Sequence, residues 1–86
     1  MNGKPLNIAF GKRLVDLRKA TGLSQEAFAF KCGIDRTYIG IIERGEKSPT
    51  LNTLNKIANG LNITLSHLMD FHYGKETGIS SSIGKD

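Results

Sequence analysis

The feature that most constrains this chain is a pair of short helical patterns, separated by a sharp break, within residues 24–45. In the first pattern Phe28, Ala29 and Cys32 recur at three- and four-residue intervals, which places their side chains on one helical face. Gly33 follows, and a residue without Cβ adopts the positive φ of a sharp turn without strain. Two short helices packed at a steep angle across such a turn are typical of a helix-turn-helix motif.

Both helices of this motif have a polar residue at the expected start. Ser24 and Asp35 are suited to accept hydrogen bonds from the free backbone N–H groups of the first turns. In the second helix one face is apolar and suited to burial, whereas the opposite face is free for a partner. The apolar face carries Tyr38, Ile39, Ile42 and, less regularly, Ile41, and the opposite face carries Arg36, Thr37, Gly40 and Arg44.

Three further helical patterns flank the motif. The first has Asn7 as its cap, ends at Gly22, and presents Lys12, Arg13 and Lys19 to solvent. The fourth follows a cap at Thr50 and carries the apolar residues Leu51, Leu54, Ile57, Ala58 and Leu61. A short fifth helix begins at Thr64 or Leu65. We therefore predict an all-α fold, a compact five-helix bundle whose second and third helices form the helix-turn-helix.

The 86 residues suffice for one small domain and not for two. We expect residues 1–6 to be a flexible leader and residues 7–72 to be the helical domain, with C-terminal helices that also dimerise. Residues 73–86 are rich in Gly, Ser, Lys and Thr, a composition that predicts a disordered tail.

Charge and composition narrow the class of function. The formal net charge of +4 and the sequence pI of about 9.5 favour a polyanionic partner. A single cysteine forms no internal disulfide, so Cys32 is interpreted as a small buried hydrophobe. His67 and His72 have no further ligands at metal-site spacing, and no catalytic triad or phosphate loop is recognisable. We expect a cytoplasmic protein without enzyme activity, cofactor, metal or membrane contact.

The residues of the motif resemble a known family. Gln25, Ala29, Gly33, Ile39 and Ile42, followed by Glu43-Arg44-Gly45, resemble the helix-turn-helix of the lambdoid phage repressor and Cro family, the xenobiotic-response-element-like regulators. The run Asp35-Arg36-Thr37-Tyr38-Ile39 followed by Ile42-Glu43-Arg44-Gly45 is similar to controller proteins of restriction-modification systems. The resemblance covers residues 10–69. It implies a lambda-repressor-like fold and a homodimer on a pseudo-palindromic operator in double-stranded DNA. It also implies control of a restriction-modification operon that includes the protein's own gene, with RNA polymerase as a candidate partner.

A recognition helix places its first turn in the major groove, so Arg36 and Thr37 are the leading candidates for base contacts. The alternative for Arg36 is a phosphate contact or an exposed, solvated side chain. Tyr38 either reaches the DNA or belongs partly to the core. Gly40 and Ile41 lie one turn further on, where the family often has polar base contacts; controller proteins carry serine at the Gly40 position.

Phosphate contacts are expected around the motif. Gln25 begins the second helix, where the resemblance and the positive end of the helix dipole both favour a phosphate; the alternative is a simple surface glutamine. The other candidates are Arg44, Lys47, Ser48 and Asn52, each with the alternative of being merely solvated. The resemblance further implies that Glu43 forms a structural ion pair with Arg18.

The last apolar residues are candidates for the dimer interface, with closure of the protomer core as the alternative; they are Leu61, Ile63, Leu65, Leu68 and Met69, with Phe71 as an extension of the strip. Two other functions stay open at this point. One is a phage- or plasmid-type repressor of a different operon. The other is an antitoxin-like or adaptor module that keeps the fold but binds proteins in place of DNA.

Overall fold

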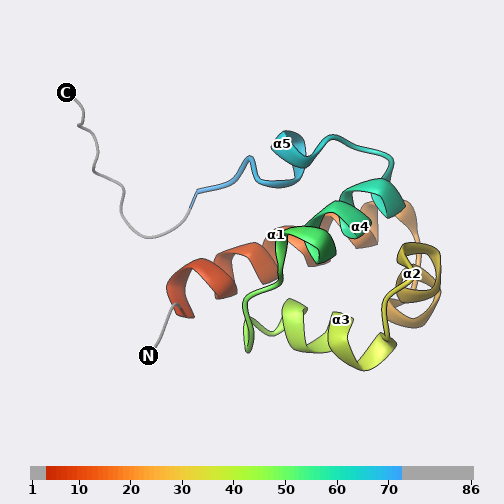
Figure 1. Ribbon diagram of the computed structural model, residues 1–86, viewed down its shortest axis with the longest axis horizontal. Helices are drawn as coiled ribbons and strands as arrows, with labels where there is room; N and C mark the ends of the chain where they lie inside the picture. The colour runs from red at the N-terminus through yellow and green to blue at the C-terminus, as the bar shows by residue number, and fades with distance from the viewer. Residues whose placement is uncertain (1–3, 73–86) are drawn as a thin grey trace.

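The structure, a computed structural model, describes residues 4–72, which form five helices and no strand (Figure 1). The helices are α1 Lys4–Thr21, α2 Gln25–Cys32, α3 Arg36–Glu43, α4 Leu51–Leu61 and α5 Leu65–Leu68. The predicted all-α fold, with the helix-turn-helix in the second and third helices, is confirmed. In the described range no helix combines the length and the apolar character needed to cross a membrane.

The long helix α1 lies at the centre of the helix contacts. It contacts both α3 and α4, while α2 packs across the ends of these two helices and α5 packs on α4 (Figure 1). In Figure 1 α3 lies below α1 and α5 lies above it, so the recognition helix and the last helix are on opposite sides of the bundle.

The predicted caps are present at the starts of α2, α3 and α4. Ser24 Oγ accepts a hydrogen bond from the Ala27 N–H at 3.1 Å, and Asp35 Oδ1 accepts one from the Thr37 N–H at 2.7 Å. Thr50 caps α4 in the same way, and Thr64 caps α5. Gly33 ends α2 with φ of 71°, which confirms the sharp turn. Each capped end satisfies backbone groups that would otherwise lack partners.

The start of α1 differs from the prediction. The helix begins at Lys4, so Asn7 is not its cap, and residues 4–6 of the predicted leader are helical. Asn7 instead uses its side-chain oxygen to accept a hydrogen bond from Ser48 Oγ at 2.9 Å, which ties α1 to the loop after α3. Residues 1–3 and the predicted tail at residues 73–86 lie outside the described part of the chain.

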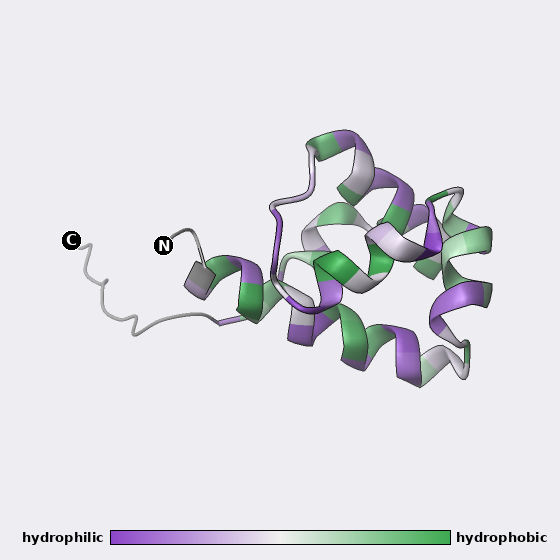
Figure 2. Cartoon of the chain, turned by 90° about the horizontal axis from the view of Figure 1, so that it is seen from below, coloured by the Kyte–Doolittle hydropathy of each residue, from purple (hydrophilic) through white to green (hydrophobic). Residues whose placement is uncertain are grey.

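The core lies where α1, α2, α3 and α4 meet. Figure 2 shows hydrophobic segments turned towards the centre of the bundle, and the largest fully buried side chains are Leu14, Phe28, Ile39, Ile42, Ile57 and Leu68. Cys32 is 7% exposed, and burial raises the pKa of its thiol to about 11, as fits a small buried hydrophobe. Leu51, one of the apolar residues at helical spacing in the fourth helix, is the first residue of α4 and is 76% exposed.

Two glycines, Gly60 and Gly11, permit a close approach of helices that the sequence pattern did not predict. A Cβ on Gly60 would collide with Cys32 Sγ, so α4 packs against α2 only without a side chain there. Gly11 lies against the end of α3: a Cβ there would collide with the Glu43 carbonyl and lie 2.8 Å from the Ile42 carbonyl oxygen. Since both obstructing atoms belong to the backbone, a side chain at residue 11 would force α1 and α3 apart.

We predict that Gly11→Ala destabilises the protein. The overpacking should cost about 1–3 kcal/mol, more than the gain of up to about 1 kcal/mol from replacing a helical glycine. Gly40→Ala is the matched control, because its Cβ would meet only side-chain atoms: the flexible guanidinium of Arg44 at 3.1 Å, and Gln25 Oε1 at an ordinary contact distance of 3.8 Å. Urea unfolding should show Gly11→Ala less stable and Gly40→Ala at least as stable as the wild type. Equal stability of the two variants would contradict the close approach of α1 and α3.

Candidate nucleic-acid interface

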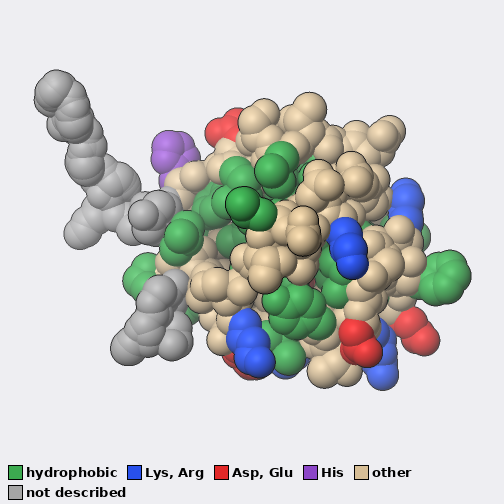
Figure 3. All heavy atoms as spheres, viewed as in Figure 1, with side chains coloured by type: hydrophobic (Ala, Val, Ile, Leu, Met, Phe, Trp, Pro, Cys, Tyr) green, Lys and Arg blue, Asp and Glu red, His purple; other side chains and the backbone are tan. Residues whose placement is uncertain are grey.

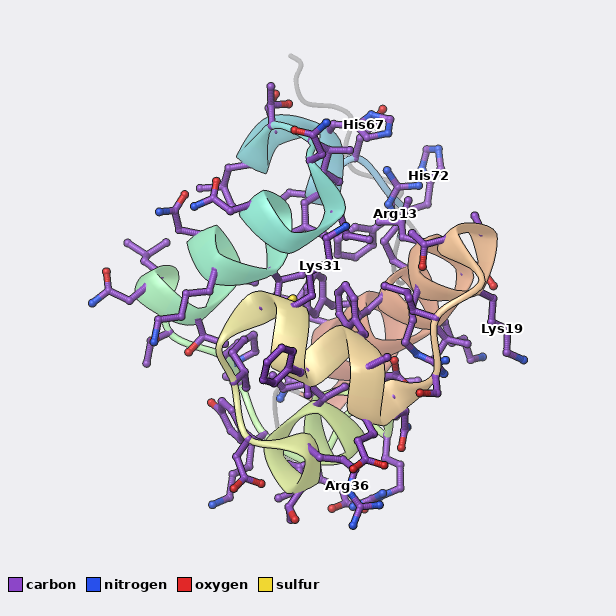
Figure 4. The ribbon with its side chains drawn as sticks, turned by 90° about the vertical axis from the view of Figure 1, so that its right-hand side faces the viewer. Arg13, Lys19, Lys31, Arg36, His67 and His72 are labelled. Carbon is purple, nitrogen blue, oxygen red and sulfur yellow. The ribbon has the colours of Figure 1, made fainter. Side chains whose placement is uncertain are left out.

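The exposed surface of the helix-turn-helix begins at the first turn of α3. Asp35 fixes this turn as its cap, and the next two side chains, Arg36 and Thr37, are exposed. Figure 4 shows Arg36 projecting from α3 away from the rest of the bundle. A guanidinium at this position has the planar pair of donors that matches guanine O6 and N7. The two leading candidates for base contacts thus lie together on a surface that no other described element covers.

The remaining candidates on α3 are less accessible. Tyr38 is partly buried and packs against the core, in line with one of its two predicted roles. Ile41 is partly buried. Gly40 is buried, which corrects its assignment as a base-contact position: the Arg44 guanidinium lies over it, and Gln25 Oε1 lies 3.8 Å from the position of its missing Cβ.

An ion pair ties α3 to α1, as the resemblance implied. Arg18 Nε lies 2.7 Å from Glu43 Oε2, and Arg18 Nη2 donates to Glu43 Oε1 at 3.2 Å. The side chains of Arg18 and Glu43 are only 12% and 4% exposed. Arg18 also donates through Nη1 to the Leu23 carbonyl at 2.9 Å, which satisfies a further donor of this nearly buried guanidinium.

Gln25 joins this pair and extends it to α2. Its Nε2 donates to Glu43 Oε1 at 2.7 Å, an interaction that is neither the phosphate contact predicted for Gln25 nor the alternative of a simple surface glutamine. Glu43 therefore holds α1, α2 and α3 together through one carboxylate. The signal available in the sequence was the glutamate on the inward side of α3, but only the fold shows that Gln25 is within reach. The phosphate contact of Gln25 stays a prediction.

The other phosphate candidates lie around the end of α3. Lys47, Ser48 and Asn52 are exposed, and Ser48 is held by Asn7. Arg44 is not free: its Nε lies 2.7 Å from Glu46 Oε2 in an exposed ion pair. The hydrogen bond from Arg44, with its positive charge, lowers the pKa of the Glu46 carboxyl. Glu46 was not among the residues predicted to contact Arg44.

The predicted dimer residues divide into two groups. Leu68 is fully buried, so its assignment to the interface is wrong; it closes the core of the protomer. Leu61 and Ile63 are partly buried against the core, whereas Leu65 and Met69 remain 37% and 38% exposed. Figure 3 shows hydrophobic side chains at the surface beside α5.

Two further contacts hold the C-terminal segment on α1. Phe71 packs against Phe10 with ring centroids 5.9 Å apart, so it belongs to the protomer and not to a free interface strip. Arg13, expected to face solvent, is partly buried and donates to the carbonyl oxygens of His67 and Leu68 at the end of α5. A cation at the C-terminal end of a helix satisfies carbonyls that lack helical partners.

Comparison with known proteins decides the family. A helix-turn-helix family model matches residues 14–68, which include all of α2, α3, α4 and α5. The chain belongs to the helix-turn-helix family. It is a DNA-binding transcriptional regulator of the same general kind as its relatives, and the predicted resemblance to controller proteins is confirmed.

Three relatives illustrate the similarity. The control protein C.MunI of a Mycoplasma species is 50% identical over 64 residues, which cover 73% of this chain and 86% of that protein. The control protein C.BamHI of Bacillus amyloliquefaciens is 36% identical over 67 residues, with 77% and 83% coverage. The crystal structure of the restriction-modification controller protein C.AhdI of Aeromonas hydrophila superposes with a TM-score of 0.70 at 45% identity, over 72% of this chain and 94% of that one.

We predict that Glu43→Gln destabilises the fold of this regulator. The substitution leaves the guanidinium of Arg18 nearly buried without its counter-charge, a change that costs about 3–5 kcal/mol when one partner of a buried pair is lost. Asp16→Asn is the control, since it removes one negative charge from an exposed position of α1 and should change stability by no more than about 0.5 kcal/mol. Chemical denaturation measures both. If the two variants unfold at the same denaturant concentration, the carboxylate of Glu43 is not the link between the three helices.

Proposed function

We propose that this protein binds a pseudo-palindromic operator as a homodimer and regulates transcription of a restriction-modification operon. The observation that carries the proposal is the exposed first turn of α3, which contains Arg36 and Thr37. The other end of this helix is held by the contacts of Glu43 with α1 and α2. A helix held in this way can enter the major groove with its N-terminal side chains against base edges. The basic net charge of +4 supports attraction to DNA.

A homodimer accounts for how so small a surface selects a site. One recognition helix covers only a few base pairs, whereas two helices about 34 Å apart contact successive major grooves on one face of the duplex. The exposed apolar side chains of Leu65 and Met69, next to the partly buried Ile63, supply the dimer surface of the proposal. This surface belongs to the side of the bundle opposite α3, so pairing through it leaves both recognition helices free.

The choice of operon rests on the relatives, which include control proteins and a restriction-modification controller protein. We further propose that the protein regulates its own gene and has RNA polymerase as a partner. We propose that the protein acts by binding DNA, as a member of a family of DNA-binding regulators.

The experiment is a selection of bound fragments from random duplex DNA, carried out with the wild type, Arg36→Ala and Lys19→Ala. Lys19 is the matched control because it is a basic, exposed residue near the end of α1, and Figure 4 shows it separate from Arg36. We predict a two-fold symmetric site for the wild type. Arg36→Ala should lose the base preference at one position in each half-site, at a cost of about 1–3 kcal/mol, whereas Lys19→Ala should select the wild-type site.

Two results would contradict the proposal. If no symmetric sequence is enriched and all three proteins lose binding alike as salt is raised, the protein does not select an operator, and a protein-interaction module becomes the better interpretation. If Arg36→Ala selects the wild-type site at every position, the guanidinium of Arg36 does not contact bases. A symmetric site located in another operon would retain the dimer but favour a phage- or plasmid-type repressor.

A further inference from the structure

The guanidinium of Arg44 occupies an unexpected place on the recognition helix. Arg44 follows the last turn of α3, yet its side chain folds back over the helix, with Nη1 3.1 Å from the position that a Cβ would have on Gly40. Residues 36, 40 and 44 are spaced by one helical turn and therefore share a face. The absence of a side chain at Gly40 thus lets the Arg44 guanidinium lie on the face that carries Arg36.

The carboxylate of Glu46 engages this guanidinium from the following loop. Arg44 Nε donates to Glu46 Oε2 at 2.7 Å, and Nη2 lies 3.4 Å from Oε1, so both carboxylate oxygens face the same guanidinium. The backbone fixes the position of Glu46, since its N–H donates to the Ile41 carbonyl at 3.0 Å. An arginine binds the oxygens of a phosphate through the same pair of donors. Glu46 therefore occupies the Nε and Nη2 pair of donors, one of the pairs through which this guanidinium could bind a phosphate.

The pair is weak enough to exchange. The side chains of Arg44 and Glu46 are 58% and 53% exposed, so water and salt screen their attraction. The buried pair of Arg18 and Glu43, at 12% and 4% exposure, behaves differently, because separation of those charges would leave them without solvent. Of the two ion pairs within residues 4–72, only the one at Arg44 can open without disturbing the fold.

We propose that Glu46 sets the affinity of this interface for DNA by competing with the phosphate backbone for the guanidinium of Arg44. The inference rests on the proposed function, because the face of α3 must contact DNA. It adds Glu46 as a residue that determines affinity without contacting DNA itself. Competition lowers phosphate binding most at low salt, where non-specific contacts are strongest. As salt rises, screening weakens both the pair and the phosphate contact, and the influence of Glu46 diminishes.

The test is a double-mutant cycle of Glu46→Gln and Arg44→Gln, with binding to a short random-sequence duplex measured by fluorescence anisotropy at about 50 and 200 mM salt. We expect Glu46→Gln to tighten binding about two- to fivefold at the lower salt, the range of an exposed ion pair. The gain should shrink at the higher salt. In the Arg44→Gln background, Glu46→Gln should leave the affinity unchanged, since the guanidinium that it releases is no longer present.

A control separates competition from simple charge repulsion. Glu26→Gln removes the same charge from the exposed first turn of α2, and Glu26 has no ion-pair partner within residues 4–72. Its effect should be the same with and without Arg44. If Glu46→Gln also tightens binding equally in both backgrounds, or has no effect in either, the competition is refuted.

The double-mutant cycle uses random-sequence DNA and requires no operator. Its result can therefore be distinguished from the result of the selection experiment that tests the proposed function. Failure to select a symmetric sequence would contradict operator binding while the cycle on random DNA still gives a result. An additive cycle would remove only the role of Glu46. Circular dichroism of each variant confirms that the exposed substitutions leave the fold intact.

Discussion

The carboxylate of Glu43 is the constraint on which the rest of the structure depends. It accepts hydrogen bonds from Arg18 on α1 and from Gln25 on α2, while it belongs to the last turn of α3. Because α3 has only eight residues, it is too short to be stable alone. The direction of its exposed first turn is therefore set by partners on the two other helices. The close approach of α1 at Gly11 lies at the same end of α3, so packing and charge act at one place.

This arrangement separates the residues that hold α3 from those that face outward. Ile39 and Ile42 are buried in the core, and Glu43 is held at the inner side, whereas Arg36 and Thr37 are exposed. Substitution of an outward residue should therefore change DNA recognition with little change in stability. Substitution of Glu43 should lower stability, and it should alter recognition only through the position of α3. The Arg44–Glu46 pair belongs to the outward group, because its charges are solvated and its loss frees a donor without exposing the core.

Local patterns in the sequence predicted the helices, because caps and apolar spacing act over a few residues. Ser24, Asp35, Thr50 and Gly33 perform the capping and turn roles expected of them. Contacts between distant segments were not predictable in this way: the partners of Gln25, Arg13 and Asn7 depend on which helices meet. The pattern also could not separate a residue that closes the core, such as Leu68, from an equally apolar neighbour left at the surface, such as Met69. For the binding surface, spacing identified Arg36 and Thr37, while the cover over Gly40 required the fold.

The central claim is that two copies of this chain place their α3 helices in successive major grooves. A hydroxyl-radical footprint on the selected duplex tests it most directly, with the wild type compared with Met69→Lys at the exposed α5 surface. The account predicts two protected windows on one face of the DNA, about 34 Å apart. They should appear together as wild-type protein is added, and at higher protein concentration with Met69→Lys. A single window, or two windows that fill independently for the wild type, would contradict it.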